Sequence, residues 1–169
     1  KGLLKTAIRD NNPVVFVESQ LLYNEKAVVP EDDYLVPFGV ANVISEGDDV
    51  SLIAWGPAVP DAIKAAEQLS AEGITADVID LRTLVPLDWE TVFASVRKTG
   101  RCVVVSQCVD IGSFTGEIVA QVTATCFDYL DAPPVKVGAK NGIAPQAYTL
   151  EEAFLPNAQD IVVAAKSLI

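Results

Sequence analysis

The sequence of 169 residues contains no histidine. Histidine is the side chain that most often acts as a general base near neutral pH, and it is a common zinc ligand. Its absence excludes catalysis of the Ser-His-Asp and Cys-His types and any zinc site held by imidazoles. A complete enzyme of the ordinary acid–base type seldom has this composition, so we expect the reacting groups to lie elsewhere.

The sequence also lacks the cysteine spacing typical of disulfide frameworks and the glycine motifs of the common phosphate-binding loops. Three cysteines, Cys102, Cys108 and Cys126, form an odd set without CxxC spacing, so we expect reduced thiols. Cys108 follows a predicted strand, but no histidine or nearby lysine is available to stabilise its thiolate, which favours an inert thiol. Neither GxGxxG nor GxxxxGK(S/T) occurs, so we interpret Gly56 and Gly112 as boundaries between elements rather than as phosphate sites.

Positive charge is scarce, since 12 Lys and Arg stand against 23 Asp and Glu, for a net charge of −11. This charge repels nucleic acids and anionic membrane surfaces and favours cationic partners. No apolar run approaches the roughly 20 residues that a membrane span requires. The start at Lys1 does not have the layout of a signal peptide. We therefore expect no nucleic-acid or membrane partner, and a soluble intracellular protein.

The first block of the sequence is typical of a helix, a turn and a strand. Residues 3–9 suit the end of a helix, residues 10–13 form a dense turn signal, and the β-branched run at 14–17 predicts a strand. One helix and one strand bury too little apolar surface to fold alone, so we expect the unit to continue upstream. Residues 24–48 lack periodicity and contain prolines, which indicates a solvated connection.

From about residue 50, apolar strands alternate with amphipathic helices. The pattern predicts strands at 50–55, 75–81, 102–105 and 134–137, and helices at 60–71, after Asp88, at 114–126 and at 158–168. Asp88 is a candidate N-cap because aspartate at this position accepts a hydrogen bond from the first helical turn. Strands that alternate with helices of this length predict an α/β protein with a mostly parallel sheet covered on both faces.

The turn at Asp10, Asn11 and Asn12 is rich in side-chain oxygens. It follows the end of a predicted helix, whose free carbonyl groups add negative partial charge. Oxygens of this kind suit a hard monovalent or divalent cation. The same residues also form ordinary Asx turns, so the spacing leaves both interpretations open.

Four blocks of sequence carry a resemblance to a known family. They are residues 5–18 (KTAIRDNNPVVFVE), 50–56 (VSLIAWG), 78–88 (VIDLRTLVPLD) and 130–133 (LDAP). In this order they resemble the beta subunits of pyruvate dehydrogenases, the decarboxylating components of 2-oxo acid dehydrogenase complexes, over essentially the whole chain. The third block is typical of the C-terminal domain shared by transketolase-like enzymes, and AIRDNNP within the first block narrows the resemblance to the 2-oxo acid dehydrogenase branch.

This resemblance implies an organisation and a cofactor. Residues 50–169 would form the transketolase C-terminal domain with a three-layer α/β/α fold, residues 37–49 a linker, and residues 1–36 the incomplete end of a pyrimidine-binding domain. The parent enzyme would hold thiamine diphosphate with Mg²⁺ between an alpha subunit and that domain, with the activating glutamate and the family's histidine upstream of Lys1. No catalytic or cofactor-binding residue is then expected in this chain, which would be inactive alone.

The resemblance also implies an ion site and protein partners. Family members carry a potassium ion at the helix-end turn. The matching ligands are the backbone oxygens of Ala7 and Ile8, together with Asp10 and Asn12. The implied partners are an alpha subunit, a second beta subunit and the small basic peripheral-subunit-binding domain of the acyltransferase. The matching docking anions are Asp131 and the terminal carboxylate of Ile169; Asp131 is alternatively a turn residue before Ala132 and Pro133.

The loop at residues 106–113 departs from the Gly-rich pattern of the family, so its role and the substrate stay open. Pyruvate is favoured, but branched-chain 2-oxo acid and acetoin dehydrogenases share most of the other blocks. Two further functions are possible: a stand-alone dimerisation and docking module, and a flavodoxin-like α/β binding domain. The AIRDNNP and DLRTLVPLD stretches count against the flavodoxin-like domain.

Overall fold

A computed structural model describes residues 1–169 and is built on a five-stranded sheet. The strand order is β1-β3-β2-β4-β5. The strands are β1 (Asn42–Ser45), β2 (Val50–Ala54), β3 (Ala76–Asp80), β4 (Cys102–Val109) and β5 (Val135–Ala139). Only β1 is antiparallel to its neighbour, and the other pairs are parallel. The predicted α/β class with a mostly parallel sheet is confirmed.

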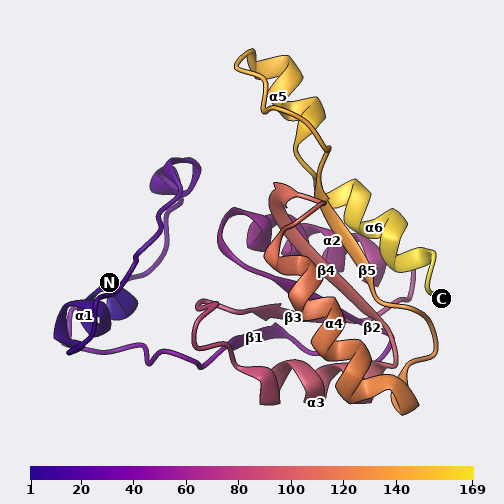
Figure 1. Ribbon diagram of the computed structural model, residues 1–169, viewed down its shortest axis with the longest axis horizontal. Coiled ribbons are helices and arrows are strands. Elements are labelled where there is room, and N and C mark those ends of the chain that lie inside the picture. Colours follow the sequence, from indigo (N-terminus) through magenta and orange to yellow (C-terminus); the bar gives the residue numbers. More distant parts are fainter.

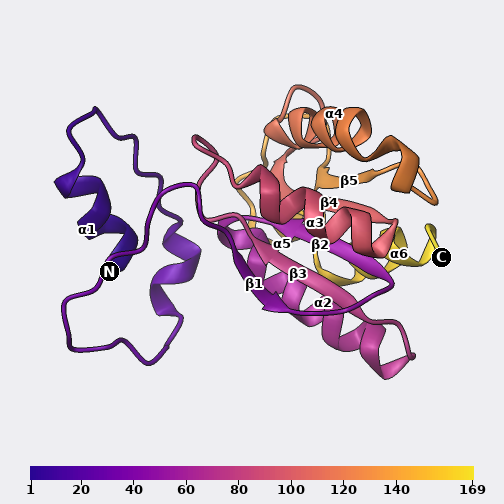
Figure 2. The same ribbon diagram turned by 90° about the horizontal axis from the view of Figure 1, so that it is seen from below.

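Helices cover both faces of this sheet (Figure 1). Helices α2 (Val59–Ala71) and α6 (Ala158–Lys166) pack on one face, and α3 (Trp89–Thr99) and α4 (Phe114–Cys126) pack on the other. Seen from below, the strands lie between α3 and α4 on one side and α2 on the other (Figure 2). The expected three-layer α/β/α fold is therefore confirmed.

The core has two halves because successive residues of a strand point to opposite faces. In β2, Leu52 and Ala54 belong to the cluster beneath α2 and α6, whereas Ile53 belongs to the cluster beneath α3 and α4. All three side chains are fully buried. A strand that is buried on both faces appears in the sequence as a continuous apolar run, which is why this strand was predicted well.

The helix boundaries follow local signals in the sequence. Asp88 caps α3 as predicted, because its side chain accepts a hydrogen bond from the backbone N–H of Thr91 at 3.1 Å. The same helix ends at Gly100, whose φ of 69° is left-handed and suits glycine. Helix α4 occupies the predicted residues 114–126. No helix of the protein has the length and apolar character needed to cross a membrane.

Residues 14–17 do not form the predicted strand. They have no hydrogen-bonded neighbour strand in residues 1–169, and Val15 and Val17 are 89% and 86% exposed. An apolar, β-branched run favours an extended backbone, but a strand also needs a partner for its N–H and C=O groups. The prediction was wrong because the β-propensity of these residues favours an extended backbone but does not supply a neighbouring strand.

Two elements were not predicted. Strand β1 lies within residues 24–48, which were interpreted as a connection, and inside the expected linker 37–49. Helix α5 (Tyr148–Phe154) lies on an arm of residues 141–153 that projects from the sheet (Figure 1). The arm closes at its base, where the backbone N–H of Lys140 donates to the carbonyl oxygen of Phe154 at 3.1 Å.

The N-terminal residues lie apart from the sheet in both views (Figures 1 and 2). Helix α1 (Gly2–Arg9) packs against the segment 30–36, where Lys5 and Arg9 both pair with Asp33. These two cations lower the pKa of the Asp33 carboxyl to about 2.

The remaining elements are the short 3₁₀ helices η1 (Gln20–Asn24), η2 (Gly56–Ala58) and η3 (Phe127–Tyr129). The division into domains at 1–36, 37–49 and 50–169 stays a prediction.

Candidate ion and docking sites

The turn after α1 is an Asx turn. Asp10 Oδ1 accepts hydrogen bonds from the backbone N–H of Asn12 at 2.7 Å and from Asn12 Nδ2 at 2.9 Å. Only this oxygen of Asp10 takes part in these bonds. The carbonyl groups of Ala7 and Ile8 belong to the last turn of α1, where a helix lacks partners for its carbonyl oxygens. The structure thus places the four predicted ion ligands in one local turn.

The kinds of oxygen ligand in this turn determine which ion it could bind. Nowhere in residues 1–169 do three or more His, Cys, Asp or Glu side chains gather in a way that could hold a metal. A divalent ion such as Mg²⁺ usually takes carboxylates, whereas carbonyl oxygens with one carboxylate suit potassium. The residues present fit a potassium ion better than a divalent one, and the ion site itself stays a prediction.

Arg101, directly before β4, contacts Asp131 and the backbone of the residue next to Ile169. Its Nη2 lies 3.2 Å from Asp131 Oδ2, and its Nε donates to the carbonyl oxygen of Leu168 at 2.9 Å. The backbone N–H of Asp131 also donates to Gly100 O at 2.8 Å. The structure therefore brings Asp131 and the chain end at Ile169 to one corner of the molecule. Sequence reasoning named both anions but missed Arg101, which has no local motif.

Asp131 has a structural role and an exposed carboxylate at the same time. Its side chain is 61% exposed, so its pair with Arg101 contributes at most about 1 kcal/mol to stability. A Cβ atom on Gly100 would lie 2.7 Å from Asp131 Oδ2, so this carboxylate would have to shift, and the left-handed φ of 69° itself favours glycine at position 100. The turn interpretation and the docking interpretation of Asp131 are thus compatible, because the exposed oxygens can accept further hydrogen bonds from a cationic partner.

A buried polar cluster lies under the N-terminal ends of the parallel strands, and the sequence analysis did not identify it. Asp77 on β3 is 3% exposed. It accepts hydrogen bonds from Gly47 N at 2.8 Å, Ser95 Oγ at 2.6 Å and Lys98 Nζ at 2.7 Å. Ser95 Oγ in turn lies 2.6 Å from Ser51 Oγ. Every charge in the cluster has a partner, so it serves the fold rather than chemistry.

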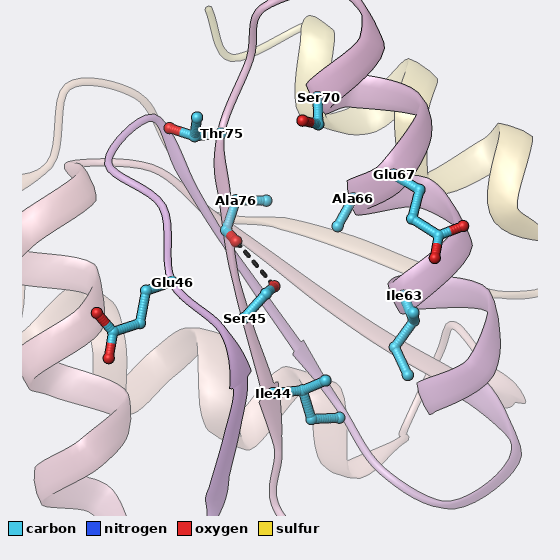
Figure 3. Close-up of a pocket in the computed structure, with 9 residues that line it drawn as sticks. All are labelled: Ile44, Ser45, Glu46, Ile63, Ala66, Glu67, Ser70, Thr75 and Ala76. Atoms are coloured by element: carbon cyan, nitrogen blue, oxygen red, sulfur yellow. Dashed lines mark hydrogen bonds between the residues drawn. The ribbon is translucent and has the colours of Figure 1, made fainter.

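A groove of about 490 Å³ lies between β1 and α2 (Figure 3). Ile44, Ile63 and Ala66 face one another across it, while the carboxylate of Glu46 points away. The hydroxyl of Ser45 donates to Ala76 O at 3.1 Å. Polar residues also line this groove, but no lining hydroxyl forms a hydrogen bond with a lining carboxylate that could serve as its base, so the groove carries no catalytic proposal.

The loop between β4 and α4 is held against β5 and the base of the arm. Lys136 Nζ lies 2.9 Å from Asp110 O and 3.3 Å from Asp110 Oδ1, and Ile111 N donates to Asn141 Oδ1 at 3.1 Å. Next to it, a second cavity of about 550 Å³ lies between β5, the arm and the start of α6. Cys108, near the end of β4, is exposed, whereas burial raises the pKa of Cys102 to about 12.

Comparison with known protein families identifies the fold. The family described as "Transketolase, C-terminal domain" matches residues 39–161. This chain belongs to the transketolase C-terminal domain family. Strand β1 lies inside the matched region, which explains why residues of the expected linker take part in the sheet of this domain.

Curated relatives of this family member are beta subunits of pyruvate dehydrogenases and of acetoin oxidoreductases. It is 44% identical to the pyruvate dehydrogenase E1 component subunit beta of Rhizobium meliloti, over 99% of this chain and 37% of the relative. The corresponding subunit of Bacillus subtilis is 41% identical, over 100% and 52%. The acetoin:2,6-dichlorophenolindophenol oxidoreductase subunit beta of Cupriavidus necator is 44% identical, over 98% and 49%. The chain thus spans about half, or less, of the length of these relatives.

A solved structure supports the same fold. A protein titled "Split gene transketolase, inactive beta4 tetramer" is 34% identical and superposes with a TM-score of 0.69, over 85% of this chain and 45% of that one. The predicted resemblance to pyruvate dehydrogenase beta subunits, with a transketolase C-terminal domain, is confirmed by these comparisons.

Proposed function

We propose that this chain is the C-terminal portion of the beta subunit of a pyruvate dehydrogenase, which decarboxylates pyruvate oxidatively and passes the acetyl unit to a lipoyl group. The observation that carries the proposal is the match along nearly the whole chain to pyruvate dehydrogenase beta subunits from several organisms. The parent protein would act in the bacterial cytoplasm, the mitochondrial matrix or a plastid, and relatives named as mitochondrial are among the matches.

The role proposed for residues 1–169 is assembly and docking. Thiamine diphosphate with Mg²⁺ supplies the stabilised carbanion of this chemistry when it is bound. Residues 1–169 offer neither a carboxylate cluster for Mg²⁺ nor a phosphate loop, so we assign that group to the rest of the parent enzyme and its alpha subunit. A potassium ion at Ala7, Ile8, Asp10 and Asn12 would fix the turn that follows α1.

A second candidate function is supported by one specific observation. The identity to the acetoin oxidoreductase beta subunit of Cupriavidus necator, 44%, equals the identity to the Rhizobium meliloti pyruvate dehydrogenase subunit. An acetoin dehydrogenase is therefore the alternative that this observation favours, and the branched-chain 2-oxo acid dehydrogenase stays an alternative from the sequence blocks alone.

Reconstitution tests the proposed reaction. The full parent beta subunit, combined with its alpha subunit, thiamine diphosphate and Mg²⁺, should turn over pyruvate with a higher kcat/KM than a branched-chain 2-oxo acid or acetoin. The 169-residue chain alone should show no turnover. A complex that is correctly assembled but acts on neither class of 2-oxo acid would refute the proposal, and a preference for acetoin would support the second candidate.

Calorimetry tests the proposed docking corner at Asp131 and Ile169. Asp131→Ala should weaken binding of the acyltransferase's basic subunit-binding domain about tenfold, because one charge-assisted hydrogen bond is lost. Asp32→Ala removes another exposed aspartate from the opposite end of the chain and should leave the affinity unchanged. An unchanged Kd for Asp131→Ala, with a wild-type melting temperature, would reject this residue as the anchor.

A further inference from the structure

The N-terminal segment, residues 1–36, is joined to the α/β domain by very few bonds. The hydrogen bonds and ion pairs of this segment lie within the segment itself, as the pairs of Lys5 and Arg9 with Asp33 illustrate. Further along the chain, the first hydrogen bonds to the domain come from the backbone N–H groups of Gly39 and Ala41. The direction in which the segment leaves the domain therefore depends on these two residues.

Both N–H groups are bound by the loop between β3 and α3. The backbone N–H of Gly39 donates to Thr83 Oγ1 at 2.9 Å, and the Thr83 hydroxyl donates in turn to Pro86 O at 2.7 Å. The backbone N–H of Ala41 donates to Asp88 Oδ2 at 2.9 Å, while the same carboxylate caps α3. Figures 1 and 2 show this loop beside the point where the N-terminal segment reaches the sheet. One short loop thus holds the incoming chain at two backbone positions.

The loop itself has a strained backbone. Arg82, with a φ of 57°, is the one residue other than glycine in residues 1–169 with a positive φ. Its backbone N–H donates to Asp80 Oδ1 at 3.1 Å, and the next N–H, that of Thr83, donates to Leu81 O, so Arg82 is the centre of a tight turn. A residue with a Cβ keeps such a conformation only where surrounding contacts fix it, often at functional positions. Here the turn places the Thr83 hydroxyl against the incoming chain.

The incoming chain also turns tightly at this contact. Gly39 has a left-handed φ of 71°, which favours glycine, and a Cβ atom there would lie 3.2 Å from Pro86 Cγ. Two residues later, Ala41 packs against the core beneath α3 and α4. The chain is therefore fixed by backbone conformation, hydrogen bonding and packing over only three residues.

We propose that the β3–α3 loop, residues 81–88, is a latch that fixes the orientation of residues 1–36 relative to the α/β domain, with the Thr83 hydroxyl as its positioning group. This hydroxyl accepts from one backbone group and donates to another, so it can bridge the chain and the loop in one arrangement only. Without it, the part-buried N–H of Gly39 lacks a partner, and other paths of the chain become favourable. The inference goes beyond the proposed function, since it concerns only how two parts of this chain are held.

Distance measurement by double electron–electron resonance tests the latch in the 169-residue chain. Native Cys108 is exposed on the domain, whereas Cys102 and Cys126 are buried, so one nitroxide is attached to Cys108 and a second to Asp32→Cys. The doubly labelled chain should give one narrow distance distribution. Adding Thr83→Val, which removes the hydroxyl and keeps the shape of the side chain, should widen this distribution at least about twofold.

Two control variants and a second readout separate the latch from a general loss of structure. Thr83→Ser keeps the hydroxyl and should retain the narrow distribution. Thr123→Val is the matched control, because Thr123 Oγ1 donates to Val119 O within α4, and it should also leave the distribution narrow. In Thr83→Val, hydrogen exchange of the Ala41 amide should accelerate about fivefold although its own acceptor is intact, because the latch opens as a unit.

A distribution that is already as wide before Thr83→Val is added would overturn the inference, and so would a folded Thr83→Val chain with the narrow distribution. If circular dichroism shows that Thr83→Val does not fold, then Gly39→Ala carries the test. This variant adds one methyl group against Pro86 at a left-handed position and should shift or widen the distribution; an unchanged distribution excludes the latch. No substrate enters these measurements, so their failure leaves the proposed reaction standing.

Discussion

A single carboxylate, Asp77, connects three elements of the molecule. Its oxygens accept hydrogen bonds from Gly47 in the turn between β1 and β2, and from Ser95 and Lys98 on α3. Gly47 is also required there, because an added Cβ would lie 2.3 Å from the backbone nitrogen of Ala76. A buried carboxylate is unfavourable unless each oxygen has partners, and here each has at least one.

Replacement of this carboxylate should destabilise the fold strongly. Asp77→Ala should lower the free energy of unfolding by about 3 kcal/mol, because it leaves Gly47 N–H and Ser95 without their buried acceptor. Urea unfolding followed by circular dichroism measures the change. Lys98→Ala is the comparison variant and should cost less than Asp77→Ala, because Asp77 loses its counter-ion but keeps its hydrogen bonds from Gly47 and Ser95. Equal losses for the two variants would contradict this account.

At the residue scale, the sequence revealed the role of a residue when its partner lies a few positions away in the chain. Asp88 was identified as an N-cap because its partner, Thr91, is three residues away. Asp77 and Arg101 were missed because their partners are distant in the sequence: Asp77 contacts Gly47, and Arg101 contacts Leu168. Only the fold brings these groups together, so no local pattern marks them.

At the scale of elements, predictions succeeded where burial on both faces and helix caps leave a local signature. Strand β2 and helix α4 were found on this basis. Strand β1 was missed because it is a short, half-exposed edge strand whose position comes from antiparallel pairing with β3. The run at 14–17 shows the opposite case, since strong β-propensity without a neighbouring strand did not produce a strand.

Helix α5 was missed for a related reason. Its arm carries exposed apolar side chains, with Ile143 96%, Tyr148 76% and Leu150 59% exposed. Amphipathic periodicity arises when one side of a helix packs on a core, and α5 projects away from the core (Figure 1). The sequence of α5 therefore shows no 3.6-residue repeat of apolar positions that would have predicted a helix. The oxygen-rich turn was identified from its own residues, whereas the ligands Ala7 and Ile8 and the anions Asp131 and Ile169 came from family resemblance, which carries non-local information that periodicity lacks.

At the scale of the whole molecule, the charge of −11 acts in opposite directions on the two proposed partners. It would attract the proposed basic acyltransferase domain toward the corner at Asp131, and it would repel a second copy of the chain. Ionic strength is therefore the variable that separates the two contacts.

Raising the salt concentration should change the two affinities in opposite senses. The screening length falls from about 10 Å at 0.1 M to about 3 Å at 1 M, so the dissociation constant of the basic domain should rise and that of self-association should fall. Calorimetry and sedimentation equilibrium in the same buffers measure both. Choline chloride serves as the control for KCl, because screening depends on ionic strength alone whereas a potassium site at Ala7 to Asn12 would respond only to KCl. If both affinities weakened in choline chloride, then charge pairing rather than long-range repulsion would dominate self-association, contrary to this expectation.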